Sequence, residues 1–451
     1  MLKRTLIMAS CIAGLTFSAS AESLDEALVA GLNKSETLMA AQQAFLSAKQ
    51  SLQLAVSAND LSGTATVKGS HTESDKKSTG GGFQSSGSFS ASVGISKRLY
   101  DSGEGEARTA SAEFALAAQK ARYRAQEQAI ILSVAEAYLN LVTAREALAL
   151  QEENVARLEA QTQATEIRLQ AGTTTATRLA EANARLARAQ SNLIAAQTRE
   201  LTAAESYQSL TGLIGDDLSL PDLMMDVPSD LSAAEQMALA NHPDIEVATL
   251  DVKAARADFE ILAKQVLPKV NFSLSATDSQ GKGTMNDKFD IKGELVFTSP
   301  ILVTPASRAR GKQASAAIER AKYQLSDAQR RVALNARSSW RTLRSTIAQR
   351  RATEAELVAA ELVAEGIRTE VEFGQKIFLD QLDAEQSVSD AKVRMVEVKQ
   401  AIMLNHYRLL SALGELDLDA FGLASKAISL DDLADPADVF TGFLPVADTP
   451  Q

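Results

Sequence analysis

The chain of 451 residues has little of what a compact enzyme or a helical membrane protein uses. It contains one cysteine, one tryptophan, nine prolines and only 5% aromatic residues. A single cysteine excludes an internal disulfide, and the low aromatic content disfavours one wide hydrophobic core. After the N-terminus, no segment approaches the ~18 uncharged apolar residues of a transmembrane helix. The abundant residues are Ala, Leu, Gln, Glu and Arg, which is typical of long, closely packed helices.

The charged and metal-ligating residues also exclude several classes of function. There are 46 basic and 57 acidic residues, so the formal charge is −11, which argues against a nucleic-acid partner. The three histidines, His71, His242 and His406, lie far apart and have no metal-ligand spacing. No phosphate-binding glycine loop is present. The sequence therefore predicts no catalytic residue, no cofactor and no firm metal site.

The N-terminus has the features of a secretory signal peptide. Met1 to Arg4 are basic at two positions, an apolar stretch follows, and Ala19-Ser20-Ala21 fits a cleavage site. We predict that residues 1–21 are removed, and Cys11 with them. The segment Met8–Cys11 weakly resembles a lipoprotein cleavage site with lipidation on Cys11. The apolar run before it is short, so we favour export without a lipid anchor.

Two long proline-free stretches, 106–220 and 306–435, indicate long helices. We predict long helices over 104–171 and 306–373, each ending at a glycine, Gly172 or Gly374. Return helices are predicted over 174–213 and 377–413. Apolar positions in the second return helix alternate steps of three and four, which is the pattern of a coiled coil. Each half thus contains a helical hairpin.

Before each hairpin, the sequence predicts a helix and then two strands. Apolar and polar residues alternate with period two near 62–71, 87–99, 269–277 and 287–298. Such alternation suits a membrane β-strand with one lipid-facing side, and it suits a half-buried soluble sheet equally.

The chain repeats itself at a spacing of 202 residues, which is its most informative property. Four residue pairs have this spacing: Gly172 and Gly374, Tyr138 and Trp340, Leu141 and Leu343, and Gly212 and Gly414. We predict a first repeat over 22–214, a linker over 215–230, a second repeat over 231–414, and a C-terminal segment with a flexible tail over 415–451. Four strands cannot close a membrane barrel alone, so the pattern favours an oligomer.

Several segments, by their order and spacing along the chain, resemble those of a known family. They are Val93–Gly103 leaving a strand, the turns Leu169–Thr173 and Val371–Gln375, and Leu379–Glu385 after the second turn. The chain resembles the TolC family of outer-membrane channel proteins. The resemblance implies a mainly α-helical homotrimer, in which four strands per chain form a shared twelve-stranded outer-membrane barrel above a periplasmic helical tunnel. It also implies a passive exit duct for efflux or type I secretion, with a periplasmic adaptor and an inner-membrane transporter as partners.

The resemblance also implies a gate near the second turn. Asp380 and Asp383 match the family's aspartate rings, which narrow the periplasmic mouth and bind blocking cations. Lys376 matches a basic residue of the family's lock, but Arg178 stands where an acidic partner is expected, and Val371 replaces a tyrosine. We therefore hypothesise that Arg178 pairs with Glu372 or Asp380. A solvated acidic helix face would show the same two aspartates.

The hairpin tips are the implied docking points for the adaptor, at Gly172, Thr173, Gly374 and Gln375. The alternatives are a periplasmic coiled-coil adaptor or a structural protein of an export complex, with a secreted enzyme last. Adaptors generally have one hairpin between β-rich domains, whereas this chain has two hairpins in a duplicated plan. A purely structural coiled coil would have no use for the four amphipathic strands.

Overall fold

The structure is a computed structural model that describes residues 23–75, 83–221, 227–282, 287–423, 430, 440–441 and 444–445. The signal peptide predicted over 1–21 and most of the tail predicted after residue 415 lie outside the described residues.

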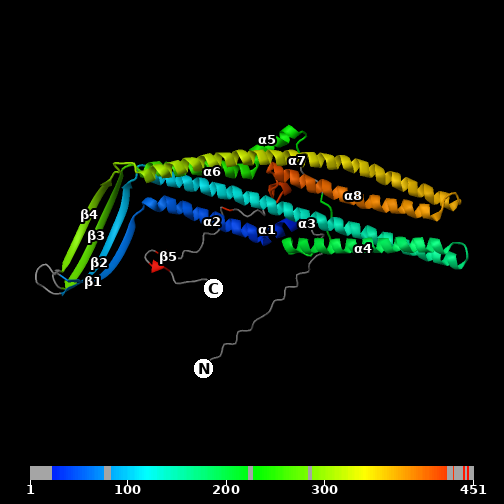
Figure 1. The fold of residues 1–451 in the computed structure, drawn as a ribbon, viewed down its shortest axis with the longest axis horizontal. Coiled ribbons are helices and arrows are strands. Elements are labelled where there is room, and N and C mark those ends of the chain that lie inside the picture. The colour runs from blue at the N-terminus through cyan, green and yellow to red at the C-terminus, as the bar shows by residue number, and fades with distance from the viewer. Residues whose placement is uncertain are drawn as a thin grey trace, which may run out of the picture.

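A four-stranded sheet forms one end of the molecule, and long helices extend from it to the other end (Figure 1). The first half comprises α1 (Leu24–Lys34), α2 (Glu36–Val56), β1 (Ser62–Asp75), β2 (Phe83–Tyr100), α3 (Glu104–Gln170) and α4 (Ala176–Thr211). The second half comprises α5 (Leu231–Asn241), α6 (Pro243–Gln265), β3 (Lys269–Lys282), β4 (Lys288–Thr298), α7 (Pro305–Glu372) and α8 (Phe378–Leu413). Short 3₁₀ turns η1 (Ser57–Asn59) and η3 (Asp419–Phe421) and the small pair β5 (Phe440–Thr441) and β6 (Leu444–Pro445) complete the chain.

The helices that precede the strands are each broken once, which the sequence did not predict. Ser35 separates α1 from α2 and accepts a hydrogen bond from the Leu38 backbone N–H through its side chain. His242 separates α5 from α6, followed by Pro243 in the first turn. Both breaks follow from capping residues that start a new helix. Within the described residues, no helix has the length and apolar character needed to cross a membrane.

The sheet has the order β1-β2-β3-β4, and every neighbouring pair is antiparallel. Its register places like residues in rows across all four strands. One row is Ala65, Val93, Ala276 and Ile291, and the adjacent row is Thr66, Ser92, Thr277 and Asp290. Because successive residues of a strand point to opposite faces, one face of the sheet is apolar and the other polar. The apolar face is exposed in the single chain, as Ile291 (70%) and Phe297 (67%) show.

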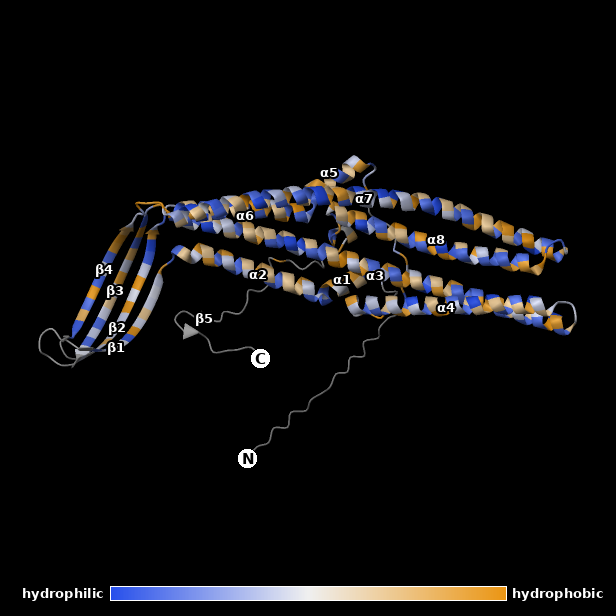
Figure 2. Cartoon of the chain, viewed as in Figure 1, coloured by the Kyte–Doolittle hydropathy of each residue, from blue (hydrophilic) through white to orange (hydrophobic). Residues whose placement is uncertain are grey.

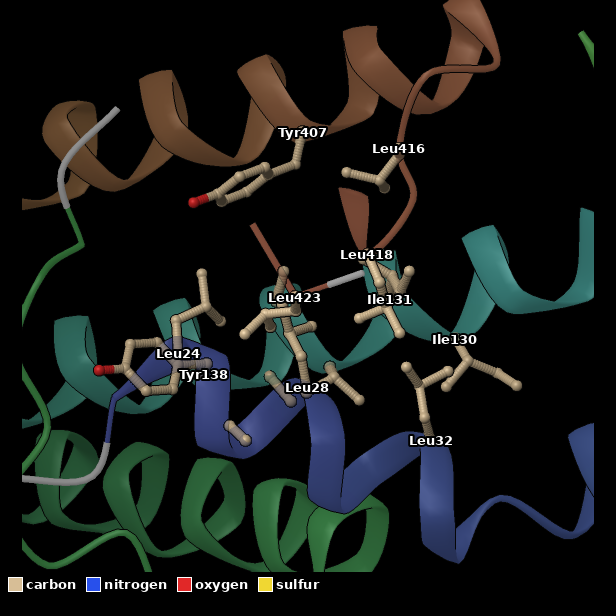
Figure 3. Close-up of a cluster of buried hydrophobic side chains, with 14 of the residues drawn as sticks. Leu24, Leu28, Leu32, Ile130, Ile131, Tyr138, Tyr407, Leu416, Leu418 and Leu423 are labelled. Carbon is tan, nitrogen blue, oxygen red and sulfur yellow. The ribbon is translucent and has the colours of Figure 1, made fainter. Parts of the chain in front are cut away.

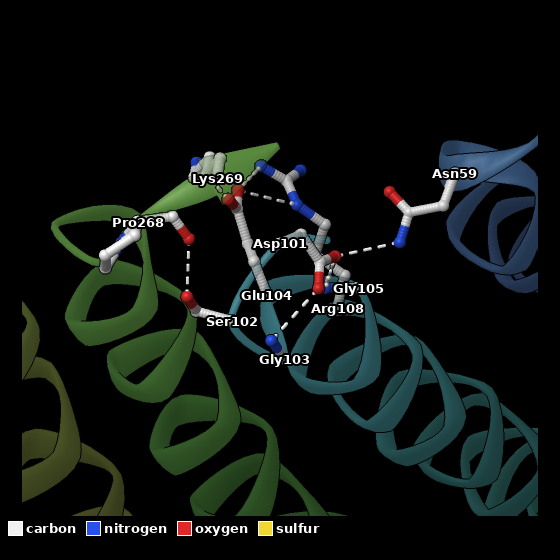
Figure 4. Close-up of polar contacts among 9 residues, drawn as sticks. All are labelled: Asn59, Asp101, Ser102, Gly103, Glu104, Gly105, Arg108, Pro268 and Lys269. Carbon is white, nitrogen blue, oxygen red and sulfur yellow. Dashed lines mark hydrogen bonds and ion pairs between the residues drawn. The ribbon is translucent and has the colours of Figure 1, made fainter. Parts of the chain in front are cut away.

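The connection from β2 to α3 is held by a compact polar network (Figure 4). The Asp101 carboxylate accepts hydrogen bonds from the backbone N–H groups of Gly103 (3.0 Å) and Gly105 (2.7 Å) and from Asn59 (2.8 Å). Glu104 is 2% exposed and pairs with Arg108 and Lys269. These contacts tie the start of α3 both to η1 and to the start of β3, so they set the angle between sheet and helices.

The largest apolar core lies midway along the long helices, where α1 packs on α3 (Figure 1), and Figure 3 shows its side chains. There α1 and the segment after α8 cover α3 from two sides. Leu28, Ile131 and Leu416 are fully buried. A smaller second core joins α5, α7 and α8 through Ala234, Ala336 and Leu409. Elsewhere the helices pack as narrow pairs, and Figure 2 shows mixed polar and apolar colouring along them.

The 202-residue repeat corresponds to equivalent positions in the two halves. Gly172 and Gly374 end the long helices with positive φ values of 73° and 71°. Tyr138 on α3 donates a hydrogen bond to the carbonyl of Ser219 (2.8 Å), and Trp340 on α7 donates one to that of Pro228 (3.1 Å). Both aromatic residues therefore hold the linker between the halves.

We predict that Glu104→Gln lowers the apparent melting temperature of the purified protein. It leaves Lys269 facing a neutral partner. Such a change costs roughly 3–5 kcal/mol in a fully buried pair, and less here because the Lys269 side chain is 22% exposed. Burial alone would raise the pKa of Glu104, but hydrogen bonds from Lys269 and Arg108 outweigh it and lower that pKa. The stabilisation is therefore present near neutral pH and lost as pH falls through the lowered pKa. Glu106→Gln, two residues away and exposed, is the control, and an equal loss in both variants would contradict the prediction.

A second carboxylate, Glu127 on α3, faces a cavity of about 220 Å³ beside the segment after α8. Burial, together with the negative charges of Asp417 and Asp419, raises its pKa from 4.5 to about 7, although Arg124 opposes the shift. The ionised form of Glu127 therefore costs stability, because a raised pKa means that the folded state prefers the proton.

We predict that Glu127→Gln is more stable than wild type at pH 8, by at most about 3 kcal/mol at 1.36 kcal/mol per pKa unit. The advantage should disappear at about pH 4.5, where Glu127 is protonated when folded and partly so when unfolded. Thermal melts at both pH values measure this, with exposed Glu113→Gln as the matched control. A gain that is independent of pH would contradict it.

Candidate functional site at the hairpin tips

The two tips have the same backbone geometry. After α3, the Thr173 N–H donates to the Arg168 carbonyl (2.9 Å), and after α7 the Gln375 N–H donates to the Glu370 carbonyl (2.8 Å). The intervening glycines adopt left-handed backbone conformations, which other residues rarely adopt. All four predicted tip residues, Gly172, Thr173, Gly374 and Gln375, are exposed. The tips are therefore tight turns that present their surfaces outward.

Asp380 lies in the first turn of α8 and has a local structural role. Its carboxylate accepts a hydrogen bond from the backbone N–H of Ile377 (3.3 Å). A carboxylate in this position also interacts favourably with the positive end of the helix dipole. One of the two predicted gate aspartates is thus engaged at its own helix end.

Asp383, one turn further along α8, pairs with α4 of the other hairpin. The Arg185 Nη1 atom lies 2.6 Å from Asp383 Oδ1. The hypothesis that Arg178 pairs with Glu372 or Asp380 is not met: within the described residues, neither Arg178 nor Lys376 makes an ion pair. Arg178 lies two helical turns before Arg185 on the same face of α4, and the axial offset of the hairpins brings the later arginine level with Asp383.

Glu385 makes a second link between the hairpins, and sequence reasoning missed it. Its carboxylate accepts hydrogen bonds from Gln161 on α3 (2.7 Å) and from Gln381 on its own helix (2.9 Å). The Arg157 Nε atom lies 3.8 Å from the same carboxylate. The available signal in the sequence was a charged residue beside the apolar stripe of the second return helix.

The α3 side of this contact is unusually polar for a buried surface. Within the part of the chain that the structure describes, four buried atoms there have no hydrogen-bond partner: Gln151 Oε1, Asn154 Nδ2, Arg157 Nε and Gln161 Oε1. The apolar part is small and centres on Val155, Leu158, Ala189 and Leu382. Unsatisfied buried polar groups cost free energy, so this part of the hairpin contact is weaker than the central core.

A groove of about 530 Å³ runs between α4 and α8 beside the Arg185–Asp383 pair. Its charged lining residues are of both signs: Glu181, Arg185, Arg188, Asp383 and Asp390. The predicted aspartates thus face a surface of mixed charge in the single chain. Within the part of the chain that the structure describes, no group of three His, Cys, Asp or Glu side chains could hold a metal ion.

Comparison with known proteins agrees with this architecture. The model of a family described as "Outer membrane efflux protein" matches residues 27–215 and 234–415, one stretch in each half. The outer membrane efflux protein BepC of Brucella suis is 26% identical over 359 residues, which cover 79% of this chain and 78% of BepC. The outer membrane protein TolC of Escherichia coli is 23% identical over 370 residues, covering 78% and 75%.

Among solved structures, the CmeC outer membrane channel of Campylobacter jejuni has a TM-score of 0.74 at 16% identity, covering 87% of this chain and 85% of CmeC. At that identity the likeness concerns the fold. The family model, in contrast, matches well over half of the sequence and includes both helical hairpins. The chain belongs to the outer membrane efflux protein family.

Proposed function

We propose that three copies of this chain form one channel that receives substrates from an inner-membrane transporter through a periplasmic adaptor. The protein is an outer-membrane exit duct for efflux or type I secretion, and it belongs to a family of channel proteins, not enzymes. The duct and its location follow from the family, whereas the trimer and its partners are our proposal.

The observation that carries the proposal is a sheet that is incomplete in the single chain. Its apolar face is exposed, and within the described residues its outer strands, β1 and β4, have no neighbour on their outer edges. In lipid, unpaired backbone groups are costly, so the edges must pair. Three chains would supply twelve strands, within the range of bacterial outer-membrane barrels.

The long helices support the periplasmic part of the duct. At 1.5 Å per residue, the 67 residues of α3 and the 68 of α7 each extend roughly 100 Å from the sheet. This length would carry the passage well away from the membrane that holds the sheet. The exposed tips at Gly172, Thr173, Gly374 and Gln375 would then be the docking points for the adaptor.

We further propose that the contact between the hairpins is the gate, with Arg185–Asp383 and the Glu385 cluster holding it closed. Three copies would bring Asp380 and Asp383 around one axis, but Asp383 is free to bind a blocking cation only when it leaves Arg185. Lys376 and Arg178 add positive charge closer to the hairpin tips. Opening would hydrate the four buried polar atoms of α3 that lack hydrogen bonds within the described residues, which offsets part of its cost.

We predict that Ile291→Lys greatly lowers the yield of folded protein in the outer membrane. A lysine on the lipid face near the middle of a barrel costs about 2–4 kcal/mol. Thr277→Lys, on the opposite face and in register with Asp290, is the matched control and should be recovered normally. Unboiled and boiled samples of the outer-membrane fraction on a denaturing gel provide the measurement. Equal recovery of both variants would contradict a membrane-embedded sheet.

We predict that Arg185→Ala raises the open probability of the reconstituted channel about 2- to 5-fold. An ion pair that is partly exposed contributes roughly 0.5–1 kcal/mol, and salt weakens it. Asp383→Ala should have the same effect, and the double variant should add little. Arg178→Ala, on the same face of α4 but without an ion pair, is the control. Single-channel recordings in planar bilayers would refute this gate if Arg178→Ala and Arg185→Ala behaved alike.

A further inference from the structure

The chain passes from strand to long helix twice, and the two connections have opposite chemistry. The first, from β2 to α3, is the polar network of Asp101 and Glu104. The second, from β4 to α7, contains Ile301, Leu302 and Val303, whose side chains are 95%, 81% and 52% exposed. Figure 2 shows this corner between β4 and α7 in the colour of hydrophobic residues. Three adjacent apolar residues so exposed need a cover that the single chain does not supply.

Basic residues follow this apolar loop directly. Arg308, Arg310 and Lys312 lie in the first turns of α7, and no acidic residue occurs between Glu294 and Glu319. All three are exposed, and none makes an ion pair within the described residues. Arg308 Nη2 donates a hydrogen bond to the Val303 carbonyl (3.4 Å).

The position of Arg308, in the first turn of α7, is unfavourable for the isolated helix. The N-terminal end of a helix carries partial positive charge, so acidic residues stabilise it and basic residues destabilise it. The equivalent end of α3 has Glu104 and Glu106 in its first turn, whereas that of α7 has no acidic residue. An anion outside the chain would compensate the basic residues of α7.

The apolar loop continues the apolar face of the sheet. Leu295 and Phe297 on β4 are 68% and 67% exposed on that face. Only Ser299 and Pro300 separate the end of the strand from Ile301. Along the chain, the order is thus an apolar strand face, an apolar loop and then cations. A bilayer leaflet presents acyl chains, an interface and then phosphates in the same order.

We propose that the β4–α7 connection is a lipid-binding surface on the helical side of the membrane. Ile301, Leu302 and Val303 enter the acyl region of that leaflet, and Arg308, Arg310 and Lys312 bind the phosphate groups of anionic phospholipids. The inference rests on the proposed placement of the sheet in the membrane. It adds a contact that fixes the depth and orientation of the strand-to-helix junction.

Tryptophan fluorescence tests the apolar part. Trp340 is the only tryptophan and lies 35 residues into α7, roughly 50 Å along the helix, so wild type supplies the background. The L302W and F297W variants are reconstituted in vesicles whose phosphatidylcholine carries bromine on its acyl chains, which quenches nearby indoles. We expect both added tryptophans to be quenched and Trp340 to be unaffected. If F297W were quenched and L302W were not, protein such as a second copy would cover the loop. That result would overturn this inference and leave the membrane placement of the sheet intact. If neither were quenched, the membrane placement would fail as well.

The head-group preference is tested with L302W in mixed vesicles. The same minority share of lipid carries bromine, either as phosphatidylglycerol or as phosphatidylcholine, in otherwise identical mixtures. From the quenching, we expect brominated phosphatidylglycerol to be enriched around L302W about five-fold over brominated phosphatidylcholine at low salt. Adding R308Q/R310Q/K312Q should abolish this preference, whereas the control R341Q/R350Q/R351Q, exposed arginines further along α7, should keep it. Equal quenching by both lipids, or the same loss in the control, would overturn the assignment of these cations.

Discussion

The pairing of β2 with β3 is the contact on which the rest of the architecture depends. It joins the two halves edge to edge over residues 87–100 of β2 and 270–282 of β3. The helices leave this joined sheet in register, so α3 and α6 lie together and are linked by Arg122 to Asp251 (2.8 Å) and by Ser111 to Asp258 (2.6 Å). Small angular differences at the sheet become large displacements at tips roughly 100 Å away. The polar network at Asp101 and Glu104 fixes the direction of α3 at this joined sheet.

Stability is distributed unevenly along the helices. Near the middle, aromatic and leucine side chains such as Tyr138, Tyr207 and Leu409 are fully buried between helices. Toward the tips, alanine pairs and a few polar contacts replace them. Regions with few buried apolar contacts open at lower cost than the core that supports them. A duct that must stay assembled while its mouth opens benefits from this arrangement, because separating the tips leaves the central core intact.

The duplication conserves the backbone plan between the halves and not the chemistry. Turn glycines and linker-binding aromatic residues occur at equivalent positions, because both halves need the same helix ends and the same anchored linker. The strand-to-helix connections differ: one is acidic and internally paired, and the other is apolar and then basic. In a channel that meets both lipid and water, each half can face a different environment while keeping the shared fold.

The sequence by itself determined the helical hairpins, the four strands, the repeat and the family, because these depend on short-range periodicity, turn residues and the spacing of similar segments. It also located the tips at Gly172 and Gly374. Only the tertiary structure decided that Arg185, and not Arg178, pairs with an aspartate of α8, and that this aspartate is Asp383. It also decided that Glu385 links α8 to Gln161 on α3. Those contacts join helices that are about 200 residues apart, and their partners depend on the axial offset and rotation of whole hairpins. No local pattern encodes that offset, since it results from the sheet register and the packing of the central core together.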